Sequence, residues 1–270
     1  MGEKKEKKVV IVTFADLGKK ENLKTVIILP LISLFREKNL LSKIFCRINK
    51  NFDFPETFSN VPQFIHYPLA FWGRFFKKTL KARILEEKIF DFFLSFKIKK
   101  SPEEKMIFFH PDYSFPKSIK IAKEQGFLTI GITSTAHAKY NANLEKEEFE
   151  RLGLERYFEK YSVYRNFLKE GFYQNELDYL IAISPFVKET YIQSGMPEEK
   201  IFVVNSDIDL SKFSPLKNKK ETIFQVIYVA QTTVLKGLHY LLQAWQKLRI
   251  KNKKLFLVGG WAFCPPDFKK

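Results

Sequence analysis

The sequence predicts an α/β fold in which a parallel sheet with helices on both faces is followed by the start of a second unit of the same kind. Short apolar runs alternate with helical segments from residue 8 to residue 204, which is typical of a parallel sheet. The same alternation restarts after Pro215. With 45% hydrophobic and 28% charged residues among 270, the chain has the composition of a globular protein.

The first unit opens with an apolar run at residues 8–14, which we predict to be a buried strand. A turn over residues 15–18 is expected to end it. Residues 22–37 are apolar nearly all round and predict no clear element. Residues 106–109 form the next predicted strand, which leads into a loop that begins at His110.

The rest of the first unit carries clear end signals. A helix over residues 115–125 stops at Gly126, a plausible C-terminal glycine. Ser184 and Pro185 have the residue types of an N-cap and a first-turn proline for the following helix. The further expected elements are strands at 128–132, 179–183 and 201–204 and a helix at 186–194.

The second unit follows a charged linker at residues 214–221. It contains an expected strand at 224–230, a helix at 237–250 and a strand at 255–258. These make one βαβ unit of the usual length, roughly 30 residues. One such unit cannot cover its own sheet, so we expect two domains, 1–213 and 214–270, of which the second is incomplete.

The formal net charge is +16. A basic excess favours anionic partners, such as nucleic acid, lipid headgroups or nucleotide phosphates. The basic residues are spread along the whole chain without a nucleic-acid-binding motif, and a solvated lysine-rich surface accounts for them equally well. Charge alone therefore selects none of these classes.

Other sequence features narrow the class of protein. Cys46 and Cys264 lie far apart and suggest neither a disulfide framework nor a metal site, which favours a cytoplasmic location. The most apolar window, residues 26–35, is too short to cross a bilayer. Walker, GxGxxG, HExxH and GxSxG patterns are absent from the sequence, and its histidines lack helical metal-ligand spacing. We expect neither a metal nor a cofactor.

Two histidines follow predicted strands. His110 comes directly after the strand at 106–109, and His137 follows the strand at 128–132 after a short polar loop. Ligands of open parallel sheets bind beyond the carboxyl ends of the strands. Either residue alone could be an ordinary loop histidine, but two at one edge favour a site there.

The loop at residues 231–237 joins a predicted strand to a helix in the second unit. Its small and polar residues leave backbone N–H groups at a helix N-terminus, and Lys236 adds a positive charge. This arrangement suits a diphosphate. The alternative is a plain turn with a solvated lysine.

Several segments resemble group 1 glycosyltransferases, also called family 4, and occur in the family's order. They are residues 133–137, 178–184, 200–204, 209–215, 228–237, 241–245 and 255–259. The matches cover most of residues 105–260. The resemblance implies a GT-B-like fold, here a Rossmann-like N-terminal domain plus the first βαβ unit of a second Rossmann-like domain.

In this family a sugar moves from a nucleotide-activated donor to an acceptor hydroxyl, with retention of configuration and without an essential metal. The resemblance implies that Gln231, Lys236 and Gly237 bind the donor. His137 would be the catalytic residue that orients a sugar hydroxyl or the reacting centre, and Gly18 and His110 lie on the acceptor side. The implied partners are a nucleotide sugar and a sugar or lipid-linked acceptor, as in polysaccharide biosynthesis, and no nucleic acid.

The sequence departs from the family in four places, one of which is a thin glycine-rich loop after the first strand, with only Gly18. Gln231 stands where the family usually has arginine, which removes a positive charge from the diphosphate site. Ser206-Asp207 replaces an Asn-Gly pair at the domain junction. The family's paired glutamates would lie beyond residue 270, so we expect an incomplete, inactive form of the enzyme. The rival interpretations are a basic nucleic-acid-binding protein and a non-catalytic remnant of a glycosyltransferase.

Residues 71–83 interleave aromatic and basic side chains and lead into a helix with an apolar stripe that includes Phe76, Phe93 and Phe96. A core helix with a solvated basic face explains this pattern. The alternative is peripheral docking to the inner face of the membrane, where a lipid-linked acceptor would be reached.

Overall fold

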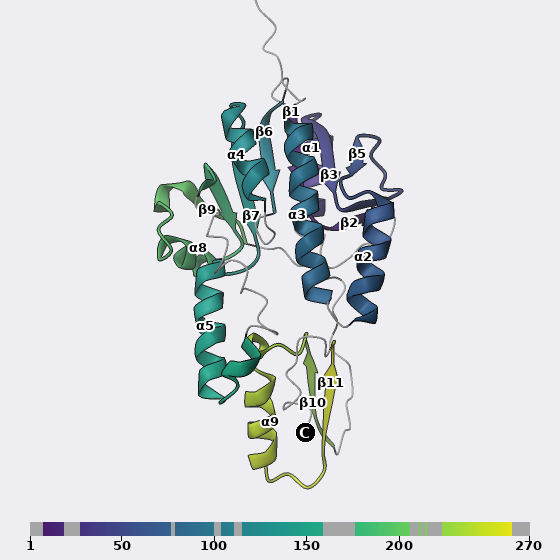
Figure 1. Ribbon diagram of the computed structural model, residues 1–270. Coiled ribbons are helices and arrows are strands. Elements are labelled where there is room, and N and C mark those ends of the chain that lie inside the picture. Colours follow the sequence, from purple (N-terminus) through teal and green to yellow (C-terminus); the bar gives the residue numbers. More distant parts are fainter. Residues whose placement is uncertain are drawn as a thin grey trace, which may run out of the picture. The chain divides into compact units, whose positions relative to one another are not determined.

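The computed structural model describes residues 8–18, 28–76, 79–99, 104–110, 115–158, 176–205, 211, 214 and 223–260 (Figure 1). These form two compact units. The first takes the described residues of Met1–His137 and Tyr173–Ser206, and the second those of Ala138–Phe172 and Asp207–Lys270. The helix after His137 thus groups with the later part of the chain, and the division at residues 213 and 214 stays a prediction.

A seven-stranded sheet, with every neighbouring pair parallel, forms the first unit. Its strands, in spatial order, are β5 (Thr57–Ser59), β3 (Leu41–Cys46), β1 (Lys8–Val12), β6 (Glu104–Phe109), β7 (Leu128–Thr133), β8 (Tyr179–Ala182) and β9 (Ile201–Val203). The predicted α/β class is therefore confirmed.

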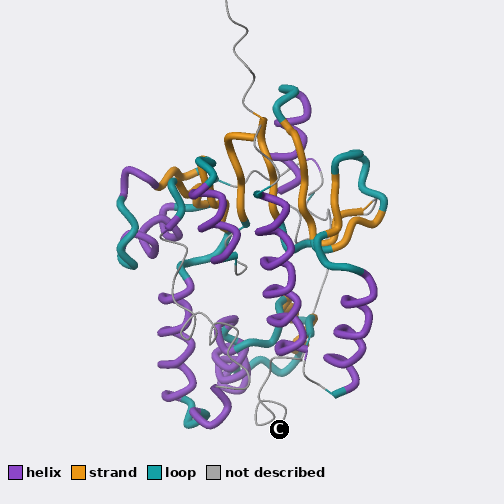
Figure 2. The backbone as a smooth tube through the Cα atoms, turned by 45° about the horizontal axis from the view of Figure 1, so that its top comes forward, coloured by secondary structure: helices purple, strands orange, loops and turns teal. Residues whose placement is uncertain are grey.

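Helices cover both faces of this sheet (Figures 1 and 2). They are α1 (Ile28–Glu37), α2 (Gln63–Phe75), α3 (Thr79–Ile98), α4 (Pro116–Glu124) and α8 (Pro185–Ile192), with the short 3-10 helix η4 at Glu198–Lys200. Successive residues of a strand point to opposite faces. Val9 and Ile11 on one face of β1 and Val10 and Val12 on the other are all buried, as a doubly covered sheet requires.

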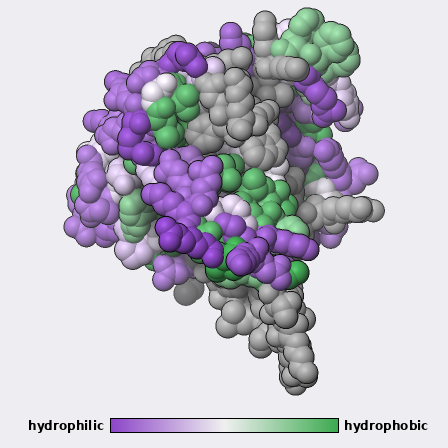
Figure 3. Space-filling view, turned by 90° about the horizontal axis from the view of Figure 1, so that it is seen from below, coloured by the Kyte–Doolittle hydropathy of each residue, from purple (hydrophilic) through white to green (hydrophobic). Residues whose placement is uncertain are grey.

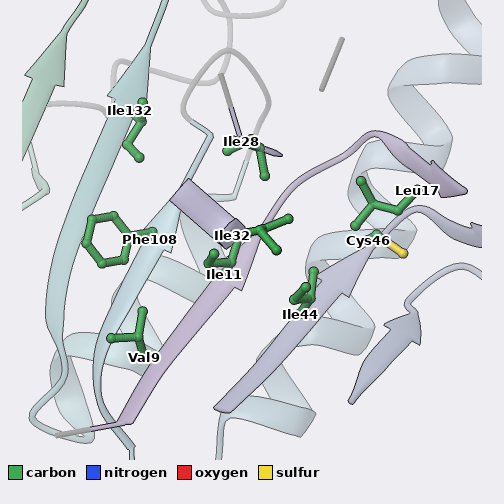
Figure 4. Close-up of a cluster of buried hydrophobic side chains, with 9 residues drawn as sticks. All are labelled: Val9, Ile11, Leu17, Ile28, Ile32, Ile44, Cys46, Phe108 and Ile132. Atoms are coloured by element: carbon green, nitrogen blue, oxygen red, sulfur yellow. The ribbon is translucent and has the colours of Figure 1, made fainter. Parts of the chain in front are cut away.

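An apolar core lies between α1 and the strands of the sheet (Figure 4), and α1 contributes Ile28 and Ile32 to it. The other members of this cluster are Val9, Ile11, Leu17, Ile44, Cys46, Phe108 and Ile132. The Cys46 thiol is buried and contacts the carbonyl oxygen of Phe58. Burial raises the pKa of this thiol to about 12.

Residues 15–18 were predicted to be a turn, and this is wrong. The structure has a short strand, β2 (Asp16–Gly18), that pairs in parallel with β4 (Ile48–Lys50). A Cβ atom on Gly18 would lie 3.0 Å from the Cβ and 3.1 Å from the carbonyl oxygen of Lys50. Close packing between two strands therefore explains the glycine.

The second unit pairs β10 (Phe224–Val229) in parallel with β11 (Lys253–Val258). Its helices are α5 (Ala138–Arg151), η2 (Glu155–Tyr157), η6 (Val234–Lys236) and α9 (Leu238–Lys247). Phe149 and Leu154, which lie in sequence between β7 and β8 of the first unit, pack with Val234 in a small apolar core. This core holds η6 against the end of α5.

One face of the β10–β11 sheet is strongly exposed. Ile227 pairs with Phe256 and Val229 with Val258, and these four side chains are between 46% and 69% exposed. Parallel sheets are normally covered on both faces. Figure 3 shows one face of the molecule, on which hydrophobic and hydrophilic residues adjoin.

Candidate functional site

The strand order reverses at β1. The chain runs from β1 to β3 and β5 on one side, then returns to β6 on the other side of β1. In open parallel sheets the crevice beyond the carboxyl ends at such a switch point is the usual ligand site. The first residues past these two ends are Thr13 and His110, so they mark the first candidate site.

His110 lies where the sequence placed it, directly after β6. Its backbone N–H donates to the carbonyl oxygen of Val12, 3.2 Å away, which ties the start of the loop to the end of β1. The side chain is only 5% exposed. Thr13 beside it is fully buried, and its backbone N–H donates to the carbonyl oxygen of Phe45 at 3.0 Å. The edge is therefore closely packed around these two residues.

His137 lies at the same edge, beyond the neighbouring strand β7. Its backbone N–H donates to Oγ1 of Thr190 on α8 at 3.0 Å. The imidazole meets the ring of Tyr191 edge to face, with centroids 4.8 Å apart, and both side chains are fully buried. The predicted pair of strand-end histidines is thus real, but His137 is also part of the packing between its loop and α8.

The candidate donor loop joins β10 to α9. Gln231 and Lys236 are exposed, and Gly237 has a left-handed backbone with φ of 66°. The prediction of a helix starting at Gly237 needs a correction, because η6 comes first and Gly237 caps α9, which starts at Leu238. A residue with positive φ at this junction favours glycine.

Two anchors hold the shape of this loop. The Tyr228 hydroxyl donates to the carbonyl oxygens of Lys236 at 3.3 Å and Gln231 at 3.5 Å. The hydroxyl and backbone N–H of Thr232 both donate to the carbonyl oxygen of Gly260, at 2.8 and 3.1 Å. The loop is therefore pinned at both ends while the Lys236 side chain stays exposed.

Sequence reasoning missed a chain of charged side chains in the first unit. Arg47 donates to Asp16 at 2.7 Å and lies 3.5 Å from Glu86, whose carboxylate also meets His66. Burial opposes ionisation of Asp16, but hydrogen bonds from Arg47 and Lys50 outweigh it and lower the Asp16 pKa. The chain links β2 to α2 and α3, and residue types alone gave no signal of it because its members lie far apart in sequence.

A second missed group surrounds Glu148 on α5. Its carboxylate accepts hydrogen bonds from Arg151 at 2.8 Å and from the Tyr240 hydroxyl at 2.8 Å, and it lies 3.2 Å from Nε2 of His239. The hydrogen bonds from Arg151 lower the Glu148 pKa to about 2. Burial lowers the pKa of His239. An acidic residue and an arginine three apart on a helix were the only sequence signal.

Within the described ranges, no group of three or more His, Cys, Asp or Glu side chains is arranged to hold a metal ion. The helices of the described residues include none with the length and hydropathy to cross a membrane.

No family model matches the chain, and no curated protein matches it either. Among solved structures it is similar to HepE from Anabaena in complex with UDP-glucose, with 15% identity, a TM-score of 0.50 and coverage of 97% of this chain and 63% of that one. The fold is GT-B-like. This confirms the predicted fold class.

Two further structures are similar to this GT-B-like chain at lower TM-scores. The lipopolysaccharide outer core galactosyltransferase WaaB in its apo form has 15% identity, a TM-score of 0.48 and coverage of 97% of this chain and 62% of that one. A UDP-N-acetylglucosamine 2-epimerase has 9% identity, a TM-score of 0.44 and coverage of 92% and 63%. The chain thus spans less than two thirds of the length of these structures.

The GT-B-like fold sorts the candidate residues into two groups. His110 and His137 share one sheet edge in the first unit, whereas Gln231, Lys236 and Gly237 share one loop in the second. Gly18 belongs to the β2–β4 pair. The two histidines thus follow neighbouring strands and the three loop residues lie within seven positions of the chain, while their roles in a site stay predictions.

Proposed function

We propose that the protein is a glycosyltransferase that moves a sugar from a nucleotide-activated donor to an acceptor hydroxyl. The observation that carries this proposal is the pinned loop between β10 and α9, which presents the exposed Lys236 beside the left-handed Gly237. A cation and a helix N-terminus are the two elements that suit a diphosphate. The GT-B-like fold shared with a UDP-glucose complex of HepE supports it.

In the proposed reaction the bond between the anomeric carbon and the diphosphate oxygen breaks, and a bond from that carbon to the acceptor oxygen forms. The departing diphosphate gains negative charge and takes up the proton that the acceptor hydroxyl loses. Lys236 stabilises that charge, which is the kind of contribution that lowers the barrier most. Gln231 donates a hydrogen bond, and Gly237 permits close approach of the backbone.

The acceptor side of the proposal rests on the first unit. His137 orients a sugar hydroxyl or the reacting centre, and His110 and Gly18 lie on the side that receives the acceptor. We propose retention of configuration, no metal and no cofactor, a cytoplasmic location, and an acceptor that is a sugar or a lipid-linked sugar. Because the chain spans 63% of the HepE structure, turnover is proposed for the whole protein.

The test is binding of nucleoside diphosphates and nucleotide sugars to the 270-residue chain, measured by calorimetry, together with release of nucleoside diphosphate in the presence of acceptors. We expect UDP or another nucleoside diphosphate to bind wild type and to bind the Lys236→Ala variant more weakly. Lys254→Ala, which removes another exposed lysine of the same unit, is the control. Equal binding by both variants and wild type would remove Lys236 from the donor site.

A second element of the proposal is peripheral contact with a membrane through α2. Phe64, Tyr67, Phe71 and Phe75 recur at helical spacing and are between 61% and 78% exposed. Phe71 and Phe75 stack with centroids 5.5 Å apart. Aromatic rings favour the headgroup boundary, and nearby cations strengthen binding to anionic lipid.

The structure describes only some of the basic side chains in the segment 71–83. Arg74 and Lys81 are exposed, Arg83 pairs with Glu87 at 2.8 Å, and Lys77 and Lys78 lie outside the described residues. We expect Phe71→Ser/Phe75→Ser to reduce co-sedimentation with anionic vesicles. Phe186→Ser on α8, another exposed aromatic position, serves as the control. Unchanged sedimentation of the double variant would leave α2 without a membrane role.

A further inference from the structure

Glu148 is the centre of a hydrogen-bonded group that joins two helices of the second unit. It lies on α5, whereas His239 and Tyr240 are the second and third residues of α9. Its carboxylate accepts from the Tyr240 hydroxyl at 2.8 Å and meets Nε2 of His239 at 3.2 Å. Figure 1 shows the C-terminal end of α5 near the beginning of α9.

The same carboxylate is held on its own helix. Arg151, one turn further along α5, donates to it with Nε and Nη2, and the Arg151 guanidinium also lies over the Tyr240 ring at 4.8 Å. The His239 and Tyr240 rings are 4.2 Å apart. Charge-assisted hydrogen bonds with several partners fix a side chain more firmly than one neutral bond. Glu148 is thus held from both helices.

The first turn of α9 directly follows the candidate donor loop. Only Gly237 and Leu238 separate Lys236 from His239. Val234, at the start of η6, packs against Phe149 of α5, the residue next to Glu148. The loop is therefore attached to α5 by an apolar contact before Lys236 and by a polar contact after it.

We propose that Glu148 is a positioning residue for the donor loop: by tying the first turn of α9 to α5, it holds the Lys236–Gly237 turn in the conformation that binds a diphosphate. The inference rests on the proposed function for its ligand. Its structural part, the tie that orders the turn, stands independently. Glu148 acts through its contacts with Tyr240 and His239 on α9. The adjacent Phe149 on α5 packs against Val234. Glu148 itself does not touch the ligand.

The experiment measures two quantities on the full chain. Hydrogen exchange of the backbone amides of residues 234–241 reports the order of the turn without ligand, and UDP is the probe for binding. Glu148→Gln should speed exchange at these amides by about tenfold and weaken UDP binding by a similar factor, since a charged hydrogen-bonded group is replaced by a neutral one. Tyr240→Phe should produce part of both effects, and the double variant less than their sum.

The matched control is Glu150→Gln, which removes an exposed carboxylate from the same helix at a position that pairs only loosely, 3.8 Å from Lys146. Wild-type exchange in Glu148→Gln would overturn the inference, as would faster exchange with undiminished UDP affinity. If UDP fails to bind wild type, the proposed donor site fails, and the exchange rates still decide whether Glu148 holds the turn. Should Glu148→Gln not fold, the Tyr240→Phe variant carries the same comparison.

Discussion

The imidazole of His137 meets the ring of Tyr191 edge-on, with centroids 4.8 Å apart and ring planes at 89°. Both side chains are fully buried, although His137 stands at the sheet edge where the acceptor is proposed to bind. A residue in this setting can support the loop, the chemistry, or both. The two roles are separable by substitution.

His137→Phe keeps a ring against Tyr191 but removes both nitrogens, whereas His137→Ala removes the ring. We expect the alanine variant to lose on the order of 2–5 kcal/mol of stability, as for a large buried side chain, and the phenylalanine variant much less. If His137 has the proposed role, both variants lose turnover. Thermal unfolding and product formation are to be measured together. Normal turnover in a folded His137→Phe protein would confine the histidine to packing.

Removing the charge of the exposed Lys236 and adding a charge at the exposed Gln231 should have opposite effects at the proposed donor site. Lys236→Ala should lower turnover of the whole enzyme by about 10²-fold, the scale of lost charge stabilisation in a transition state. Gln231→Arg should strengthen UDP binding, because it restores a charge that the resembled family carries there. Calorimetric titration of the two variants beside Gln231→Glu, which reverses the sign of the added charge, checks this. Weaker binding by Gln231→Arg would place the diphosphate elsewhere.

The two adjacent glycines after β11 should differ in how well they tolerate substitution by alanine. Gly259 has φ of 154°, and a Cβ atom there would overlap the carbonyl oxygen of Ala230, whereas a Cβ on Gly260 meets nothing within 4 Å. Gly259→Ala should therefore separate the end of β11 from the strand end at Ala230 and raise hydrogen exchange along β10. Gly260→Ala should leave exchange near wild type. Equal exchange in the two variants would contradict the close approach.

Acid should loosen the second unit. Burial lowers the His239 pKa below 6.5, and hydrogen bonds from Arg151 first, then Tyr240, lower the Glu148 pKa from 4.5 to about 2. A group with a depressed folded pKa stabilises the fold above its unfolded pKa and loses that contribution as pH falls towards its folded value. Stability should thus decline below about pH 6.5 through His239 and again between pH 4.5 and 2 through Glu148.

Urea unfolding at a series of pH values, followed by the fluorescence of Trp245 on α9, is the measurement. Trp72 and Trp261 are replaced by phenylalanine so that Trp245 reports alone. Glu148→Gln should lack the step below pH 4.5, and His239→Gln the one below pH 6.5. A wild-type midpoint that stays flat down to pH 3 would rule out this linkage.

The strands of the first unit were predictable because each is short, apolar and followed by a helix with clear end signals. The Oγ of Ser184 accepts from the Val187 N–H at 3.3 Å, as the predicted N-cap requires. The N-terminus of α4 was less readable. Its first amides donate to Asp91 on α3, 2.9 Å from both Lys117 and Ser118. A cap supplied by a distant helix leaves no local pattern.

The predicted apolar stripe beside residues 71–83 was wrong in register. Phe76 and Phe96 are exposed, and the buried face of α3 instead carries Phe90, Leu94 and Ile98. Phe90 packs against Phe14 and Phe115, whose ring centroids lie 5.5 and 5.4 Å from its own. A helix with aromatic residues on several faces does not reveal which face will be covered, since its partners come from elsewhere in the chain.

The candidate site also has features that the sequence predicts and features that it does not. Positions after strands were predictable, so His110, His137 and the loop at 231–237 were found. The contacts of Glu148 were not, because they join residues 148 and 240. The end of α9 was also misjudged, since Lys253 donates to the carbonyl oxygens of Trp245 and Leu248 at 2.8 and 2.6 Å and so closes the helix early. Such long-range contacts follow from tertiary packing.

The buried thiol of Cys46 can serve as a chemical reporter of opening of the sheet at β3. A thiol with a pKa of about 12 presents almost no thiolate at neutral pH, and alkylating reagents react with thiolate. Cys46 lies on β3, second from one edge of the seven-stranded sheet. In a Cys264→Ser protein, alkylation of Cys46 therefore proceeds only when β3 leaves the sheet. Its rate in iodoacetamide, followed by mass spectrometry as the carbamidomethyl group is added, reports the population of the opened state on that side of the first unit.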